Sequence, residues 1–215
     1  MRIDILVLPM VAAMLLAGCS FPSPPPTNMA PIADIPASAA GPIGPLNGKT
    51  VGVLFDDDTA TDLDYLRRYH QHAVSSLEGR LLISEIRQGY AESSRPDRTL
   101  AAIKDAFSSR LKQVTFYGDL CSLEQGDPDI FVVVHTHHAL LTPRSSDVRV
   151  DYVADFFDRD YQYLGRAQGH RAAMMPALWS DHQRTEQIVG ELDRQQVVQG
   201  EALDQFGNSL SRLLQ

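Results

Sequence analysis

The segment from Asp129 to His135, which reads DIFVVVH, places the strongest constraint on the fold of this chain. Successive side chains of a β-strand point to opposite faces of the sheet, so the unbroken apolar residues 130–134 put hydrophobic side chains on both faces. Such a strand is stable where both of its faces are covered by other parts of the protein. We therefore predict that this segment is a central strand of a sheet.

Other segments supply the elements around that strand. Further strands are predicted at 50–55, 114–117, 149–157 and around Tyr161 and Tyr163, with a hairpin turn at 158–160. Apolar residues recur every three or four positions over 63–73, 96–111 and beyond residue 179, which predicts helices. The segment 81–86 fits either a helix or a strand, and the last helix carries the stripe Leu203, Phe206, Leu210 and Leu213. The pattern predicts an α+β fold with a mixed sheet of about five strands, helices mainly on one face and a C-terminal amphipathic helix.

The N-terminus has the pattern of an export signal. An apolar run from Ile5 to Leu16 is too short to span a bilayer as a helix and matches the core of a signal peptide. It ends in Leu16-Ala17-Gly18-Cys19, which resembles the lipobox of bacterial lipoproteins. The resemblance implies removal of residues 1–18 and a diacylglycerol thioether on Cys19. An ordinary secretory signal or an N-terminal anchor is the alternative, and either would still export the chain.

The residue after the lipobox cysteine and the segment beyond it suggest where the protein works. Ser20, in place of an aspartate, implies sorting to the outer membrane by the lipoprotein rule of enteric bacteria, with the chain on the periplasmic face. Residues 19–48 are rich in Pro, Ala, Gly and Ser and almost free of charge, which is typical of an unfolded tether. We therefore predict a signal peptide at 1–18, a tether at 19–48 and a periplasmic α+β domain at 49–215.

Charge and cysteine content exclude some function classes. The chain carries a formal net charge of −8 and only three lysines, which argues against nucleic-acid binding. If Cys19 carries lipid, Cys121 is the one remaining cysteine and cannot form an internal disulfide. Because an exposed lone thiol is a liability outside the cell, we expect Cys121 to be buried.

The order of elements suggests a relationship with envelope lipoproteins. An apolar strand, a helix, a strand that starts with aspartate and aliphatic residues, an antiparallel hairpin and a final helix follow one another over most of residues 49–215. This order resembles the amino-terminal domain of the Tol-system translocation protein B and the periplasmic part of the curli secretion lipoprotein. The resemblance implies an envelope role and carries over no functional residue.

An acidic triplet, Asp56-Asp57-Asp58, directly follows the first predicted strand. The spacing of Asp56 and Asp58 resembles the nucleophile motif of haloacid dehalogenase phosphatases, and Gly118-Asp119 with Glu124 could supply Mg²⁺ ligands. The threonine that the motif requires two residues beyond the second aspartate is missing, since position 60 is Ala. The alternative is a loop whose side chains cap the next helix.

A histidine cluster follows the central strand. His135 and His137 would point to the same side of a strand, and with His138 they are the candidates for Zn²⁺ or Cu²⁺ ligands. A third ligand would have to come from the Asp56–Asp58 loop or from another histidine: His70, His72, His170 or His182. The alternative is a set of hydrogen-bonded structural histidines.

No complete catalytic motif is present. The sequence has no Gly-x-Ser-x-Gly elbow, Walker loop, Rossmann glycine pattern or His-Glu-x-x-His. Aromatic residues that could form a binding patch, or equally belong to the core, are Tyr152, Tyr161, Tyr163 and Trp179. We therefore predict a non-enzymatic lipoprotein without a cofactor, attached to the membrane through Cys19, that binds or scaffolds proteins of an envelope assembly or export apparatus. A periplasmic metal-binding protein and a Mg²⁺-dependent phosphatase remain the alternatives.

Overall fold

The computed structural model describes residues 42–75, 82–142, 145–176 and 184–215. These residues form one five-stranded sheet with the strand order β2-β1-β3-β4-β5. The elements along the chain are β1 (Val51–Phe55), α2 (Asp57–Ser75), α4 (Ser84–Glu92), α5 (Pro96–Ser108), β2 (Val114–Tyr117), α6 (Leu120–Gln125), β3 (Ile130–Ala139), β4 (Asp147–Asp158), β5 (Tyr163–Met174) and α7 (Thr185–Leu213). The predicted α+β class, with a mixed five-stranded sheet and a C-terminal helix, is confirmed.

The sheet has a parallel half and an antiparallel half that meet at β3. β1 pairs in parallel with β2 on one side and with β3 on the other, whereas β4 runs antiparallel to both β3 and β5. The apolar segment singled out in the sequence therefore forms the middle strand, as predicted. Phe55 pairs with Val134, and β3 continues past the end of β1 as far as Ala139.

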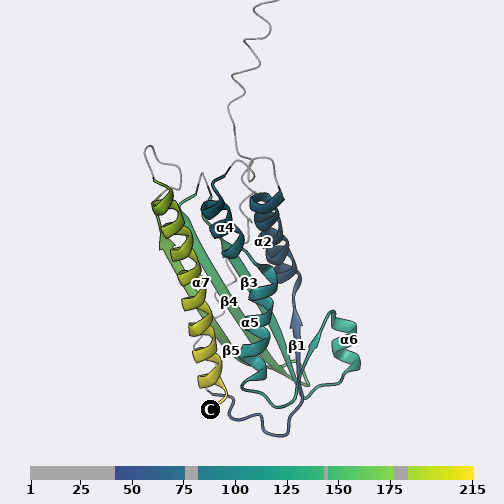
Figure 1. The fold of residues 1–215 in the computed structure, drawn as a ribbon. Helices are drawn as coiled ribbons and strands as arrows, with labels where there is room; N and C mark the ends of the chain where they lie inside the picture. The colour runs from purple at the N-terminus through teal and green to yellow at the C-terminus, as the bar shows by residue number, and fades with distance from the viewer. Residues whose placement is uncertain (1–41, 76–81, 143–144, 177–183) are drawn as a thin grey trace, which may run out of the picture.

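Four helices of the described residues cover one face of this sheet. Figure 1 shows α2, α4, α5 and α7 together in front of the strands. Pro96 opens α5 at a position where its missing N–H is not needed. The core is centred on Phe107 of α5, whose ring lies 6.3 Å from that of Phe156 in β4 and 5.9 Å from that of Phe206 in α7.

The short helix α6 lies apart from the other four, beside the ends of β1 and β2 (Figure 1). Its residue Leu123 is buried against Gly52, on the sheet face opposite to Val51 and Val53. α6 was not predicted, because six residues are too few to show a helical period. A signal was nevertheless present, since the Asp119 side chain caps the helix by accepting a hydrogen bond from Ser122 N.

Two further expectations differ from the structure. The segment 81–86 fitted either a helix or a strand. Within the part of it that the structure describes, helix α4 begins at Ser84. Cys121, which we expected to be buried, is exposed, because α6 lies at the edge of the domain and buries only Leu123. Among the described residues, no helix is long and apolar enough to cross a membrane.

Candidate functional site

The candidate site lies where the parallel strands β1 and β3 separate. The Asp56 N–H donates a hydrogen bond to the Val134 carbonyl, which brings the next residue of β3, His135, beside the end of β1. Helix α2 begins directly after Asp56, so that Asp58 stands in its first turn. Chain segments 79 residues apart thus bring two carboxylates and an imidazole together.

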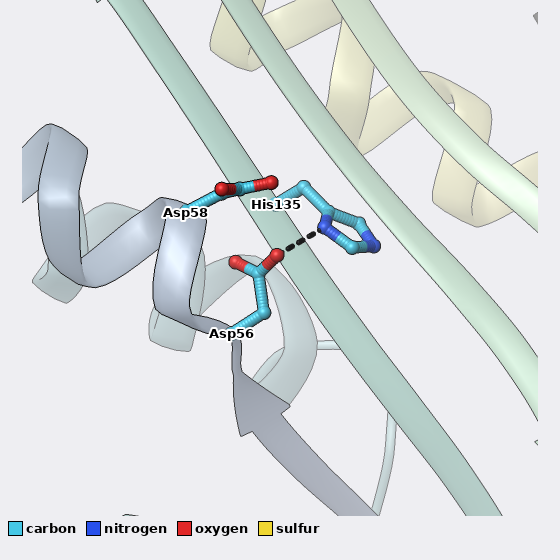
Figure 2. A group of neighbouring side chains, drawn as sticks. All are labelled: Asp56, Asp58 and His135. Atoms are coloured by element: carbon cyan, nitrogen blue, oxygen red, sulfur yellow. Dashed lines mark hydrogen bonds and ion pairs between the residues drawn. The ribbon is translucent and has the colours of Figure 1, made fainter. Parts of the chain in front are cut away.

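The three side chains form a compact group. Asp56 Oδ2 lies 2.5 Å from His135 Nδ1. One ligand atom from each of Asp56, Asp58 and His135 lies within 4.8 Å of the other two. Figure 2 shows both carboxylates on the side of the β1–α2 junction that faces β3. Asp58 is exposed and the other two are half-buried, so the group opens to solvent on one side.

Neighbouring residues hold this group in place. Asp56 Oδ1 accepts the N–H of Thr59 at 2.8 Å, which fixes the carboxylate as the cap of α2. The second ring nitrogen of His135, Nε2, lies 3.6 Å from Asp155 Oδ2. The Arg166 guanidinium in turn binds both oxygens of Asp155, at 2.7 and 2.8 Å. The network therefore runs across the sheet from β1 through β3 and β4 to β5.

The charges of this network reinforce one another. The neighbouring carboxylates of Asp155 and then Asp56 raise the pKa of His135 to about 9, against the opposing effect of burial. Burial alone would raise the pKa values of Asp56 and Asp155, but their hydrogen bonds outweigh it and leave both values below the ordinary range. At neutral pH His135 is therefore an imidazolium between the carboxylates of Asp56 and Asp155.

The structure separates the three histidines that were candidates for one metal site. Alternation along β3 puts His137 on the same side as His135 but His138 on the helix-covered side, where it is fully buried. Burial lowers the pKa of His137, whose Nδ1 is buried without a hydrogen-bond partner among the described residues. Of the three histidines, His135 is the one grouped with Asp56 and Asp58. The loop that carries these two aspartates is one of the places from which the sequence analysis expected a third ligand.

His138 belongs to a buried polar network of its own. Its Nδ1 lies 2.6 Å from Asp62 Oδ2 and its Nε2 lies 3.0 Å from the Tyr152 hydroxyl. Asp62 also accepts hydrogen bonds from Thr136 Oγ1 and the His138 N–H. This order of carboxylate, imidazole and hydroxyl resembles a catalytic triad, but all three side chains are buried. Asp62 and His138 are completely enclosed, so the network fastens α2 to the sheet.

The remaining sequence candidates are dispersed. His70 Nδ1 lies 3.0 Å from the Ala91 carbonyl oxygen, and His170 Nδ1 lies 2.5 Å from Asp151. Asp119, considered as a Mg²⁺ ligand, caps α6 instead. Among the aromatic candidates that the structure describes, Tyr152 is in the core, whereas Tyr161 is exposed and stacks on Phe131. Three sequence candidates lie outside the described residues: Cys19, Trp179 and His182.

A separate cavity of about 240 Å³ lies between α5 and α7. Its lining includes Arg95, Arg98, Thr99, Tyr152 and Gln199. The guanidinium of Arg95 is 2.9 Å from Asp97 and the amide of Gln199 donates to the Ser93 carbonyl. Two polar side chains of this cavity are therefore engaged with residues outside its lining.

Comparisons with known proteins identify no family. No family model matches the chain, and no curated protein matches it. Among solved structures, a PelC variant from Paraburkholderia phytofirmans, described as a dodecamer, is similar at a TM-score of 0.39 and 11% identity, covering 82% of this chain and 96% of that one. A second PelC dodecamer structure from the same organism gives a TM-score of 0.36 and 11% identity, covering 78% and 93%. Similarity at this level carries no inference about function.

Proposed function

We propose that the protein is a non-enzymatic, membrane-anchored lipoprotein that binds or scaffolds part of a cell-envelope assembly or export apparatus. The observation that carries this proposal is Leu16-Ala17-Gly18-Cys19 directly after the apolar run 5–16. Two acyl chains on Cys19 would provide stable anchoring in a bilayer. Ser20 favours the periplasmic face of the outer membrane.

The segment that follows supports a scaffolding role. Residues 19–41, which precede the part of the chain that packs on the domain, would reach roughly 70 Å in an extended polyproline conformation of about 3.1 Å per residue. The folded domain could then engage partners well away from the membrane surface. The contacts of Asp62 with His138 and of Asp119 with Ser122 also favour a structural use of acidic side chains over catalysis.

Replacement of one cysteine at a time tests the anchor. We expect the wild-type chain and Cys121→Ser to sediment with the outer membrane and to show the mass of a diacylated mature chain that begins at Cys19. Cys19→Ser should remain unprocessed or appear soluble in the periplasm. Because Cys121 is exposed, its replacement is a matched control for the loss of a thiol. Membrane association of Cys19→Ser in detergent-free buffer would contradict the lipid anchor.

Recovery of partners tests the scaffolding role. The lipidated protein, solubilised from membranes after cross-linking, should retain an envelope protein in stoichiometric amount, and Cys19→Ser should lose most of it. Absence of any such protein from both samples would contradict the scaffold. Hydrolysis of a phosphomonoester in Mg²⁺ that Asp56→Asn abolishes would contradict the non-enzymatic assignment.

A further inference from the structure

We propose that Asp56, Asp58 and His135 bind a divalent transition-metal ion, with Zn²⁺ as the best match. The group combines two carboxylates from the β1–α2 junction with one imidazole from β3, as Figure 2 shows. Imidazole and carboxylate are ordinary zinc ligands, and three protein ligands with one open position is a common zinc arrangement. Such a metal would sit at the sheet surface, apart from the membrane anchor.

The distances within the group suit a single ion. Zinc binds nitrogen and oxygen ligands at about 2.0–2.2 Å, so two ligand atoms on one ion lie at most about 4.4 Å apart. The three ligand atoms here lie within 4.8 Å of one another, which small side-chain rotations convert into a coordination shell. Asp58 is exposed and can adjust its side chain without disturbing the core. The metal would take the place of the direct contact between Asp56 Oδ2 and His135 Nδ1.

The surroundings of His135 give an independent reason for a metal. A histidine that binds a metal through one ring nitrogen characteristically has a carboxylate against the other, which fixes the ring and makes it a better ligand. Here Nδ1 faces Asp56 while Nε2 faces Asp155, 3.6 Å away. Arg166 holds Asp155 by two hydrogen bonds. The chain thus contains a supporting shell of carboxylate and guanidinium as well as the three ligands.

Sheet topology is a second independent reason. Ligands of open sheets with parallel strands bind beyond the carboxyl ends of the strands, where the strand order reverses. β2 follows β1 on one side, and the chain then crosses to place β3 on the other side of β1. Asp56 directly follows β1, and His135 is the first residue of β3 beyond its last partner in β1. The three ligands therefore stand beyond the strand ends, at the position where this topology places ligands.

The ligand set also selects among metals. One nitrogen and two carboxylate oxygens suit borderline ions such as Zn²⁺ better than Mg²⁺, which retains most of its water and prefers oxygen ligands alone. Without a thiolate or thioether in the group, soft Cu⁺ is disfavoured. The open position on the solvent side would hold water.

Zinc titration of the full chain, purified without a polyhistidine tag and measured against a competing chelator, tests the proposal. We expect one Zn²⁺ per chain, with binding weakened at least about tenfold in Asp58→Asn and in His135→Gln. Asp57→Asn removes the same charge from the adjacent exposed position, outside the ligand group, and should change the dissociation constant less than twofold. His137→Gln, on the same side of β3, is the matched control for the loss of an imidazole.

Three results would overturn the proposal. Wild-type protein that binds Zn²⁺ no more tightly than Asp58→Asn would show that the group is not a metal site. Equal weakening of Zn²⁺ binding by Asp57→Asn and Asp58→Asn would show that the ion is attracted by charge alone. Equal weakening by His137→Gln and His135→Gln would show that His135 is not the specific imidazole ligand. Because Asp58 is exposed, Asp58→Asn should fold as wild type does, and Zn²⁺ should raise the melting temperature of wild type only.

Discussion

At the scale of single residues, alternation along β3 assigns its histidines to different roles. His138 is completely buried, and both of its ring nitrogens have partners, Asp62 and Tyr152. His135, three residues earlier, lies on the opposite face between two carboxylates. One residue type thus serves as a core hydrogen-bonding group and, on the other face, as the centre of an ion network.

The ion network makes stability depend on pH. His135 has a folded-state pKa of about 9, above its ordinary 6.5, so its contribution is complete below about pH 6.5 and is lost as pH rises through about 9. A shift of this size corresponds to about 3 kcal/mol, and partial exposure of the side chain (23%) reduces this to about 2 kcal/mol. We expect the free energy of unfolding, measured in urea with a chelator present, to fall by about that amount between these pH values.

His135→Gln is the control for this effect. The variant should be less stable than wild type at pH 6.5 and should approach it at pH 9, because the glutamine side chain does not titrate. Asp56 and Asp155 have lowered pKa values, so their contribution is present above about pH 4 and is lost as pH falls below it. If wild type and His135→Gln lost the same free energy of unfolding between pH 6.5 and 9, the pH dependence would come from groups other than His135.

At the scale of elements, the contact between β5 and α7 depends on one glycine. A Cβ atom on Gly169 would lie 2.0 Å from the Ala202 carbonyl oxygen and 2.5 Å from the Phe206 backbone nitrogen. These atoms belong to the helix backbone, so no side-chain rotation relieves the clash. The C-terminal helix therefore packs against the sheet at a distance that only glycine permits at this position.

Alanine substitutions at two glycines separate this packing effect from helix propensity. Gly169→Ala should lower the free energy of unfolding by about 2–3 kcal/mol, because α7 must move away from β5. Gly200→Ala, in α7 itself, meets no atom within 4 Å and should raise stability by about 0.5–1 kcal/mol. Denaturant unfolding of both variants measures the difference. A free energy of unfolding unchanged in Gly169→Ala would show that α7 is loosely attached to the sheet.

Sequence patterns predicted these elements where a period was long enough to detect. The apolar run of β3 indicated the central strand, and the stripe with Phe206 and Leu210, both fully buried, indicated the docked face of α7. The six residues of α6 show no period and were missed. The pairing of Asp56 with His135 could not be predicted, because it depends on β1 and β3 being neighbours, a relation that spans 79 residues.

At the scale of the whole molecule, the start and the end of the described chain meet at one end of the domain. The Ile43 N–H donates a hydrogen bond to the Leu213 carbonyl oxygen, 2.9 Å away. Ile43 and Leu46, within the segment predicted as tether, pack against the hydrophobic core. The chain from residue 42 onward thus contributes to the fold before β1 begins.

Two truncations should therefore behave differently. A chain that begins at Pro42 should unfold at the same urea concentration as the mature protein, because residues 20–41 have the composition of a tether. A chain that begins at Lys49 loses the hydrogen bond to Leu213 and the partial burial of Ile43 and Leu46, which together contribute about 2 kcal/mol. Ile43→Ser in the longer chain should reproduce about half of that loss. If removal of residues 20–41 is itself destabilising, the tether packs on the domain, and the reach assigned to it from the membrane would be too long.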